Sequence, residues 1–277
     1  MRIAICNEVL ASLDFPRQCA LAAALGYDGL EIAPFTFGDE PHRLARARRA
    51  KIRRVAADAG LAITSLHWLL VRPAGLSITS ADALVRARTL DVMRRLVELA
   101  ADLGCGAMVH GSPDQRMLPP GREALAARAR AVEALASVAE EAERAGVTYC
   151  IEPLAPAETN FVNSVSEAVE IVRAIGSPAV LTMIDCNAAS QTETESVPAL
   201  IDRWLPTGLV AHIQVNDANG RAPGQGTDRF VPIFAALKRN GYSRTVAVEP
   251  FEYVPDGPTA AARAIGYVRG ILESLGE

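Results

Sequence analysis

The chain has 277 residues, 50% of them apolar, and a formal net charge of −4. A single α/β barrel needs about 250 residues, so we expect one domain over residues 1–277. The acidic balance disfavours nucleic acid and anionic membranes as partners. No apolar run approaches the roughly 18 residues that a membrane span requires.

The cysteines and the first ten residues indicate the cellular compartment in which the protein is expected. The chain holds five cysteines, an odd number, with no C-x-x-C spacing. Buried thiols in a reduced, cytoplasmic protein are therefore expected. Residues 1–10 carry Glu8 and lack a small-residue cleavage site, so they indicate a first strand rather than a signal peptide.

Short apolar or β-branched runs alternate with helix-forming stretches along the whole chain. Strands are predicted at Arg2–Cys6, Gly29–Ile32, Ala62–His67, Ala107–His110, Val147–Glu152, Val180–Asp185, Leu209–His212 and Thr245–Glu249. Helices are predicted near Pro16–Leu25, His42–Ala59, Ala81–Leu103, Arg122–Ala145, Val165–Ile175, Val197–Leu205, Val231–Asn240 and Thr259–Ser274.

A glycine follows seven of the helix-forming stretches, as is typical of a helix that ends and passes into a strand. These glycines are Gly26, Gly60, Gly104, Gly146, Gly176, Gly208 and Gly241. With the first strand they predict eight βα units and the fold class α/β, a single (β/α)₈ TIM barrel. An open doubly wound sheet would carry a G-x-G-x-x-G or P-loop motif after a strand, and neither motif occurs.

Polar residues end the predicted strands, where the active groups of such barrels lie. They are Asn7, Glu31, His67, His110, Glu152, Asp185, His212 and Glu249. For Asn7 and Glu31 a hydrogen-bonded structural role and a functional role are equally open.

The last four strand ends bring together three carboxylates and an imidazole. Packed carboxylates repel one another unless a cation lies between them. We therefore predict a divalent metal bound by Glu152, Asp185, His212 and Glu249. These ligand types suit Mn²⁺ (our first expectation) and also Co²⁺, Mg²⁺, Fe²⁺ or Zn²⁺.

Loops after the strands supply candidate substrate contacts. Glu158 and Asn160 can bind hydroxyl groups, and Arg221 offers fixed hydrogen-bond donors. Trp68 either stacks on a sugar or packs, with packing somewhat favoured. The loops Trp68–Ser80 and Gly111–Gly121 should border the mouth of the site.

With these residues assembled, the chain resembles the sugar isomerase/epimerase family with a xylose-isomerase-like barrel, which includes D-tagatose and D-psicose 3-epimerases and hydroxypyruvate isomerase. The resemblance covers essentially the whole chain. It implies a metal-dependent isomerase or epimerase of carbohydrate metabolism, acting on a ketose or related hydroxy-ketone through an enediolate. Glu152 and Glu249 would exchange the proton, and Glu158 and Arg221 would contact the substrate. From their positions alone, His67, His110, Trp68 and Asn160 are further candidate substrate contacts. The resemblance also implies a homodimer or homotetramer.

One position departs from the family pattern. The ketose epimerases usually carry a histidine three residues after the metal-binding aspartate, where this chain has Ala188. A metal-dependent lyase or dehydratase acting on a keto-sugar or 3-keto-glycoside therefore stays open. Less favoured are an endonuclease IV-like DNA repair enzyme, which needs a histidine-rich zinc cluster, and a non-catalytic sugar-binding protein.

Overall fold

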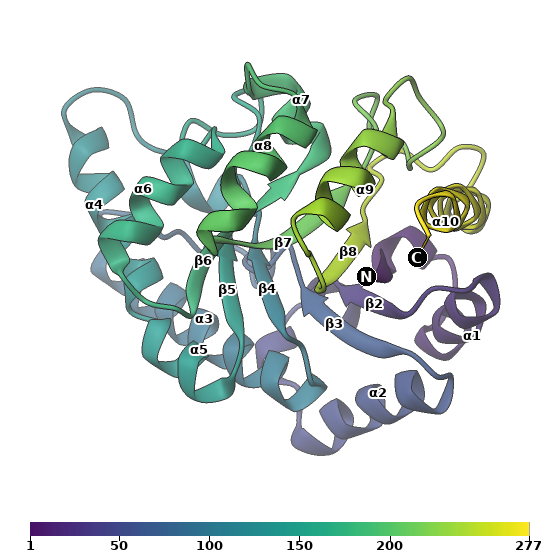
Figure 1. Cartoon of the computed structure of the whole chain (residues 1–277). Coiled ribbons are helices and arrows are strands. Elements are labelled where there is room, and N and C mark those ends of the chain that lie inside the picture. The colour runs from purple at the N-terminus through teal and green to yellow at the C-terminus, as the bar shows by residue number, and fades with distance from the viewer. Residues whose placement is uncertain (277) are drawn as a thin grey trace.

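Eight parallel strands close into a barrel in the order of the chain, as predicted (Figure 1). The computed structural model describes residues 1–276. The strands are β1 (Arg2–Cys6), β2 (Gly29–Ile32), β3 (Ala62–Leu66), β4 (Ala107–His110), β5 (Thr148–Ile151), β6 (Val180–Asp185), β7 (Val210–Val215) and β8 (Thr245–Val248).

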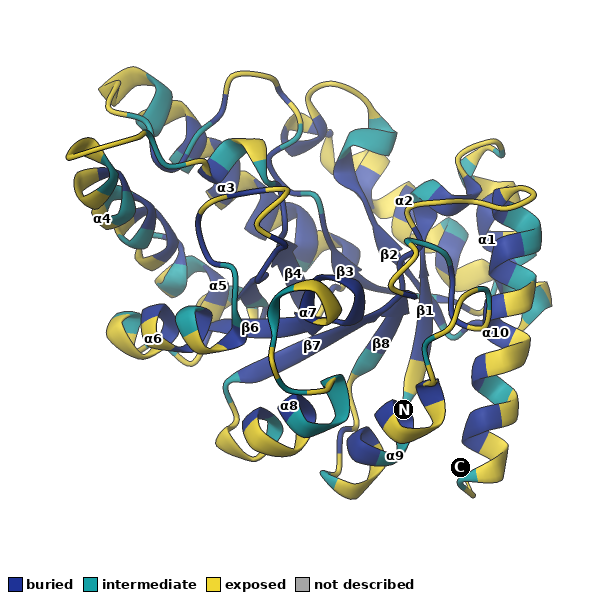
Figure 2. Cartoon of the chain, turned by 90° about the horizontal axis from the view of Figure 1, so that it is seen from above, coloured by how far each residue is buried: buried dark blue, intermediate teal, exposed yellow. Residues whose placement is uncertain are grey.

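Helices surround the strands and bury one side against them, while their outer sides are exposed (Figure 2). They are α1 (Phe15–Leu25), α2 (Arg46–Asp58), α3 (Ala83–Leu103), α4 (Glu123–Ala136), α5 (Ala139–Ala145), α6 (Val165–Ile175), α7 (Cys186–Thr192), α8 (Val197–Trp204), α9 (Phe230–Arg239) and α10 (Gly257–Ser274). Short 3₁₀ turns occur at Asn7–Leu10, Pro34–Phe37, Pro41–Arg43, Asp114–Arg116 and Leu205–Thr207.

Local sequence signals fix many helix ends. Asp14, Asp82, Ser164 and Asp256 cap α1, α3, α6 and α10, each side chain accepting a hydrogen bond from a backbone N–H of the first turn. All seven predicted glycine stops have positive φ angles, between 67° and 94°. The left-handed conformation is strained for residues with a Cβ atom, so glycine ends these segments without that strain.

The structure corrects several predicted bounds. The stretch 122–145 forms two helices, α4 and α5, and α2 begins at Arg46, after a 3₁₀ turn that contains His42. The short helix α7 was not predicted. Strand β7 continues to Val215, so His212 lies within the strand and not at its end. This last difference changes which side chains reach the mouth of the barrel.

The remaining whole-chain expectations concern cysteines and membranes. All five cysteines are buried free thiols. No helix within residues 1–276 is long and apolar enough to cross a membrane.

Candidate functional site

Three carboxylates meet at the carboxyl ends of β5, β6 and β8. Glu152, Asp185 and Glu249 each place a carboxylate oxygen so that the three atoms lie within 4.8 Å of one another. All three side chains are buried. The structure thus brings together the three acidic residues that the sequence pattern assigned to a metal.

Burial and mutual repulsion make this cluster costly without a cation. Burial raises the pKa of Asp185 and Glu249 above the ordinary carboxyl range. For Glu152, burial and then the neighbouring Glu249 and Asp185 raise the pKa in the same direction. Oε2 of Glu249 has no hydrogen-bond partner among the described residues. The donor set therefore fits a bound divalent cation, which would neutralise the carboxylates.

Buried polar groups hold two of these residues in place. Asp185 caps α7 by accepting a 2.7 Å hydrogen bond from Ala188 N at Oδ1, and its Oδ2 accepts one of 2.7 Å from Asn216 Nδ2. The fully buried Arg116 donates from Nη1 to the carbonyl oxygen of Glu152 at 2.6 Å. Nothing in the sequence around Arg116 distinguishes it from the exposed arginines, so sequence reasoning missed it.

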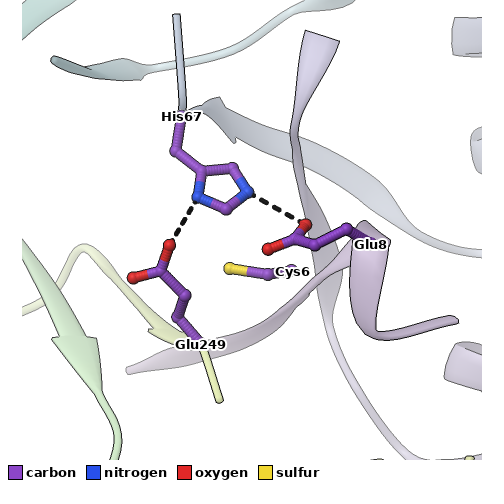
Figure 3. Close-up of side chains that lie close together, drawn as sticks. All are labelled: Cys6, Glu8, His67 and Glu249. Atoms are coloured by element: carbon purple, nitrogen blue, oxygen red, sulfur yellow. Dashed lines mark hydrogen bonds and ion pairs between the residues drawn. The ribbon is translucent and has the colours of Figure 1, made fainter. Parts of the chain in front are cut away.

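His67 links Glu249 to the 3₁₀ turn that follows β1 (Figure 3). Its Nδ1 lies 2.8 Å from Glu249 Oε1, and its Nε2 lies 3.1 Å from Glu8 Oε2. Burial alone would lower the pKa of His67, but Glu8 and Glu249 outweigh it and raise the pKa well above its ordinary value. A charged imidazolium between two carboxylates satisfies both of them, and the Sγ of Cys6 lies beside this group.

His212, the fourth expected ligand, does not join the three carboxylates. Its Nε2 lies 2.7 Å from Oε2 of the buried Glu31, an ion-pair distance, although the ring N–H is not aligned as a hydrogen bond. Ser65 Oγ donates to the same carboxylate, and Gln214 Nε2 donates to its Oε1 at 2.6 Å. Burial would raise the pKa of Glu31, but His212, His67 and the hydrogen bond from Ser65 together outweigh it, and the pKa lies well below its usual range. Glu31 therefore acts as the charged partner of His212 inside the barrel.

The cavity beside the carboxylates gathers several of the predicted groups. It is lined by His67, Trp68, Gly111, Glu152, Leu154, Glu158, Glu249 and Phe251. Its free space is about 10 Å³, enough for about one water, so a sugar needs the rim side chains to move. Both predicted mouth loops reach it, through Trp68 and Gly111.

Three of the predicted substrate contacts have partners away from this cavity. His110 is fully buried with Nδ1 2.8 Å from the hydroxyl of Tyr149. The amide of Asn160 exchanges hydrogen bonds with the backbone of Leu118. Arg221 places Nε 3.5 Å from Glu252 Oε2. None of these three lines the cavity next to the carboxylates.

A larger cavity of about 410 Å³ lies at the opposite, amino-terminal end of the strands. Residues that begin strands line it, such as Arg2, Ala62 and Thr245, and it reaches inward to His212. It has no carboxylate in its lining, so it is not the metal centre.

Comparison with known proteins decides the family. Residues 19–271 match the family model described as xylose isomerase-like TIM barrel. The chain belongs to this family. It is 29% identical over 234 residues to D-psicose 3-epimerase of Agrobacterium fabrum, an alignment that covers 83% of this chain and 76% of that protein.

Solved structures of other proteins share the fold. An L-ribulose 3-epimerase is 26% identical with a TM-score of 0.83, over 99% of this chain and 95% of that one. A 3-keto-D-glucoside 4-epimerase from E. coli has the same fold, with a TM-score of 0.83 at 20% identity over 98% and 99% of the two chains. All three of these similar proteins are sugar epimerases.

Proposed function

We propose that this chain is a divalent-metal-dependent sugar epimerase that inverts a carbon next to the carbonyl of a ketose. The observation that carries the proposal is the convergence of Glu152, Asp185 and Glu249, all buried, with ligand atoms within 4.8 Å. The likeness to epimerases of free ketoses supports the substrate class.

The bound ion would be held by these three carboxylates and would supply a Lewis acid for the negative charge that develops on the substrate oxygens. Glu152 or Glu249 takes the proton from the carbon beside the carbonyl. The electron pair of the broken C–H bond enters an enediolate. The other glutamate returns a proton to the opposite face, and the centre is inverted. Positioned acid–base groups of this kind contribute about 10²–10⁴-fold each.

The surroundings of the two glutamates support these roles. His67 holds Oε1 of Glu249 and leaves Oε2 without a partner. Glu152 and Glu249 both line the small cavity, together with Glu158 and Trp68, so a substrate there meets both. The four histidines have different partners, which does not favour a histidine-rich nuclease centre. His67 lies beside Glu249, His110 beside Tyr149 and His212 beside Glu31, and His42 lies in the 3₁₀ turn Pro41–Arg43.

The test is a panel of free ketoses, hydroxypyruvate and 3-keto-sugars incubated in D₂O with Mn²⁺, Co²⁺ or Mg²⁺. We expect deuterium at the carbon next to the carbonyl of at least one ketose, together with its epimer. Release of a leaving group from a 3-keto-glycoside, without an epimer, would instead favour the lyase. Full activity of metal-free protein would overturn the proposal.

A further inference from the structure

The register of β6 and β7 places Gln214, and not His212, at the level of the metal-binding aspartate. Asp185 pairs with Gln214, while His212 pairs with Met183, two residues earlier on β6. Side chains two residues apart on a strand point to the same side. His212 and Gln214 therefore both face the barrel interior, with Gln214 one layer nearer the mouth.

The amide of Gln214 has a defined orientation. Its nitrogen must face Glu31, because Nε2 donates to Glu31 Oε1 at 2.6 Å and the opposite orientation would set two acceptor oxygens against each other. Its oxygen has no hydrogen-bond partner in the described chain, although the residue is fully buried. A buried acceptor without a donor calls for a partner that the protein does not supply.

Glu249 presents a second oxygen of this kind. Its Oε2 is also buried and without a hydrogen-bond partner in residues 1–276, and its residue follows directly on β8, the neighbour of β7. Gln214 pairs with Asp185 on β6 and with Ala247 on β8, and Ala247 lies two residues before Glu249, so these side chains share the inner face of the barrel. A cation would satisfy both unpartnered oxygens at once.

His212 already contacts another residue, Glu31. It is 2% exposed, its Nε2 contacts Glu31, and no grouping of metal-binding side chains within 4.8 Å among residues 1–276 includes it. To ligate an ion at the level of Asp185 it would have to leave Glu31, a buried carboxylate that then loses this contact.

We propose that the amide oxygen of Gln214 is the fourth protein ligand and that the site is built entirely from oxygen. The proposal rests on the metal dependence of the proposed function. Carboxylate and carbonyl oxygens suit Mn²⁺ and Mg²⁺, whereas imidazole shifts a site toward Zn²⁺ and other nitrogen-binding ions. The residue at position 214 thus sets the metal preference of this chain.

The test measures metal binding and ligand type directly, without turnover. Metal-stripped full-length protein is loaded with Mn²⁺, and pulsed electron paramagnetic resonance reports any directly bound nitrogen. We expect no imidazole nitrogen signal in the unaltered protein and a new signal in Gln214→His. A nitrogen signal in the unaltered protein that disappears in His212→Gln would overturn the proposal, whatever the behaviour of the other variants.

Mn²⁺ and Zn²⁺ titrations of the same proteins give the second readout. Gln214→Met should weaken Mn²⁺ binding about tenfold or more, since loss of even an outer-shell partner costs 10–100-fold. Gln214→His should regain affinity and shift the preference toward Zn²⁺, and the matched control His212→Gln should retain the Mn²⁺ affinity. Unchanged Mn²⁺ binding in Gln214→Met refutes the ligand, whereas failure of the unaltered protein to bind any divalent ion refutes the proposed function itself.

Discussion

His67 and Glu249 form a 2.8 Å contact between Nδ1 and Oε1 at the mouth of the barrel. The same ring reaches Glu8 with its other nitrogen, so a single imidazolium holds two carboxylates that come from opposite ends of the chain (Figure 3). His67 thus fixes Oε1 of Glu249, while Oε2 has no hydrogen-bond partner among the described residues.

Replacement of this histidine should therefore impair turnover more than metal binding. In His67→Gln the side chain has no charge and can satisfy only one carboxylate well, so Glu249 loses its fixed position. We expect kcat to fall about 10–100-fold, as for outer-shell partners of metal ligands, with a smaller change in Mn²⁺ affinity. Steady-state kinetics and Mn²⁺ titration test this, with His42→Gln as the control, a histidine that does not line the cavity beside the carboxylates. Equal kcat in both variants would contradict it.

The proposed acid–base roles of Glu152 and Glu249 should be separable from metal binding. Glu152→Gln and Glu249→Gln keep an amide oxygen that ligates weakly but cannot take a proton. We expect each to reduce turnover by about 10²-fold or more while some bound metal remains. Metal analysis beside isotope exchange on an active ketose measures both properties, and full exchange in either variant would remove that glutamate from the mechanism.

Gly111 should be required because Glu152 occupies the space next to it. A Cβ atom at position 111 would lie 1.8 Å from Glu152 Oε2, so Gly111→Ala displaces the carboxylate. We expect metal affinity to fall about tenfold, a typical result of disturbing a ligand's support.

The matched control for Gly111 is Gly106→Ala, before the same strand β4. A Cβ there meets nothing within 4 Å. Isothermal titration with Mn²⁺ compares the two variants, and equal affinities would show that Glu152 adjusts to the added methyl group without loss.

Removal of the metal should make stability depend on pH with a definite sign. Burial is the main cause that raises the pKa values of Glu152, Asp185 and Glu249 in the folded protein, and for Glu152 the like-charged Glu249 adds to it. The folded state thus binds more protons than the unfolded state, so stability falls as pH rises from the ordinary carboxyl range, about 4, through the raised values.

His67 acts in the same direction, because its raised pKa means that its stabilising charge is lost as pH rises through the folded value. We therefore expect the Tm of metal-stripped protein to decline from mildly acidic to mildly alkaline pH. Saturating Mn²⁺ should reverse the trend, since ligands bind the ion as deprotonated groups. Thermal melts across this range, with and without Mn²⁺, measure it; a metal-free Tm that rises over the same range would contradict it.

Much of the architecture could be predicted from local signals. Apolar runs, the glycines after seven helix-forming stretches and the polar residues after the strands are properties of short segments, and they sufficed for the eight units and for Glu152, Asp185 and Glu249. The bounds of α4 and α5 and the existence of α7 were missed. Asp185 is the N-cap of α7, so a side chain of the carboxylate cluster also starts a helix.

Only the tertiary structure decided which residue of β7 stands beside Asp185. The pairing of β6 with β7 shifts by one residue between Thr182 and Met183, and after the shift Asp185 lies opposite Gln214. Without the shift it would lie opposite Ile213, whose side chain alternates to the other side of the sheet. The register between two strands depends on the packing of the whole barrel, so it cannot be predicted from the sequence of either strand alone. The sequence alone therefore determined the barrel and its three converging carboxylates, whereas tertiary pairing placed His212 beside Glu31 and set Gln214 level with Asp185.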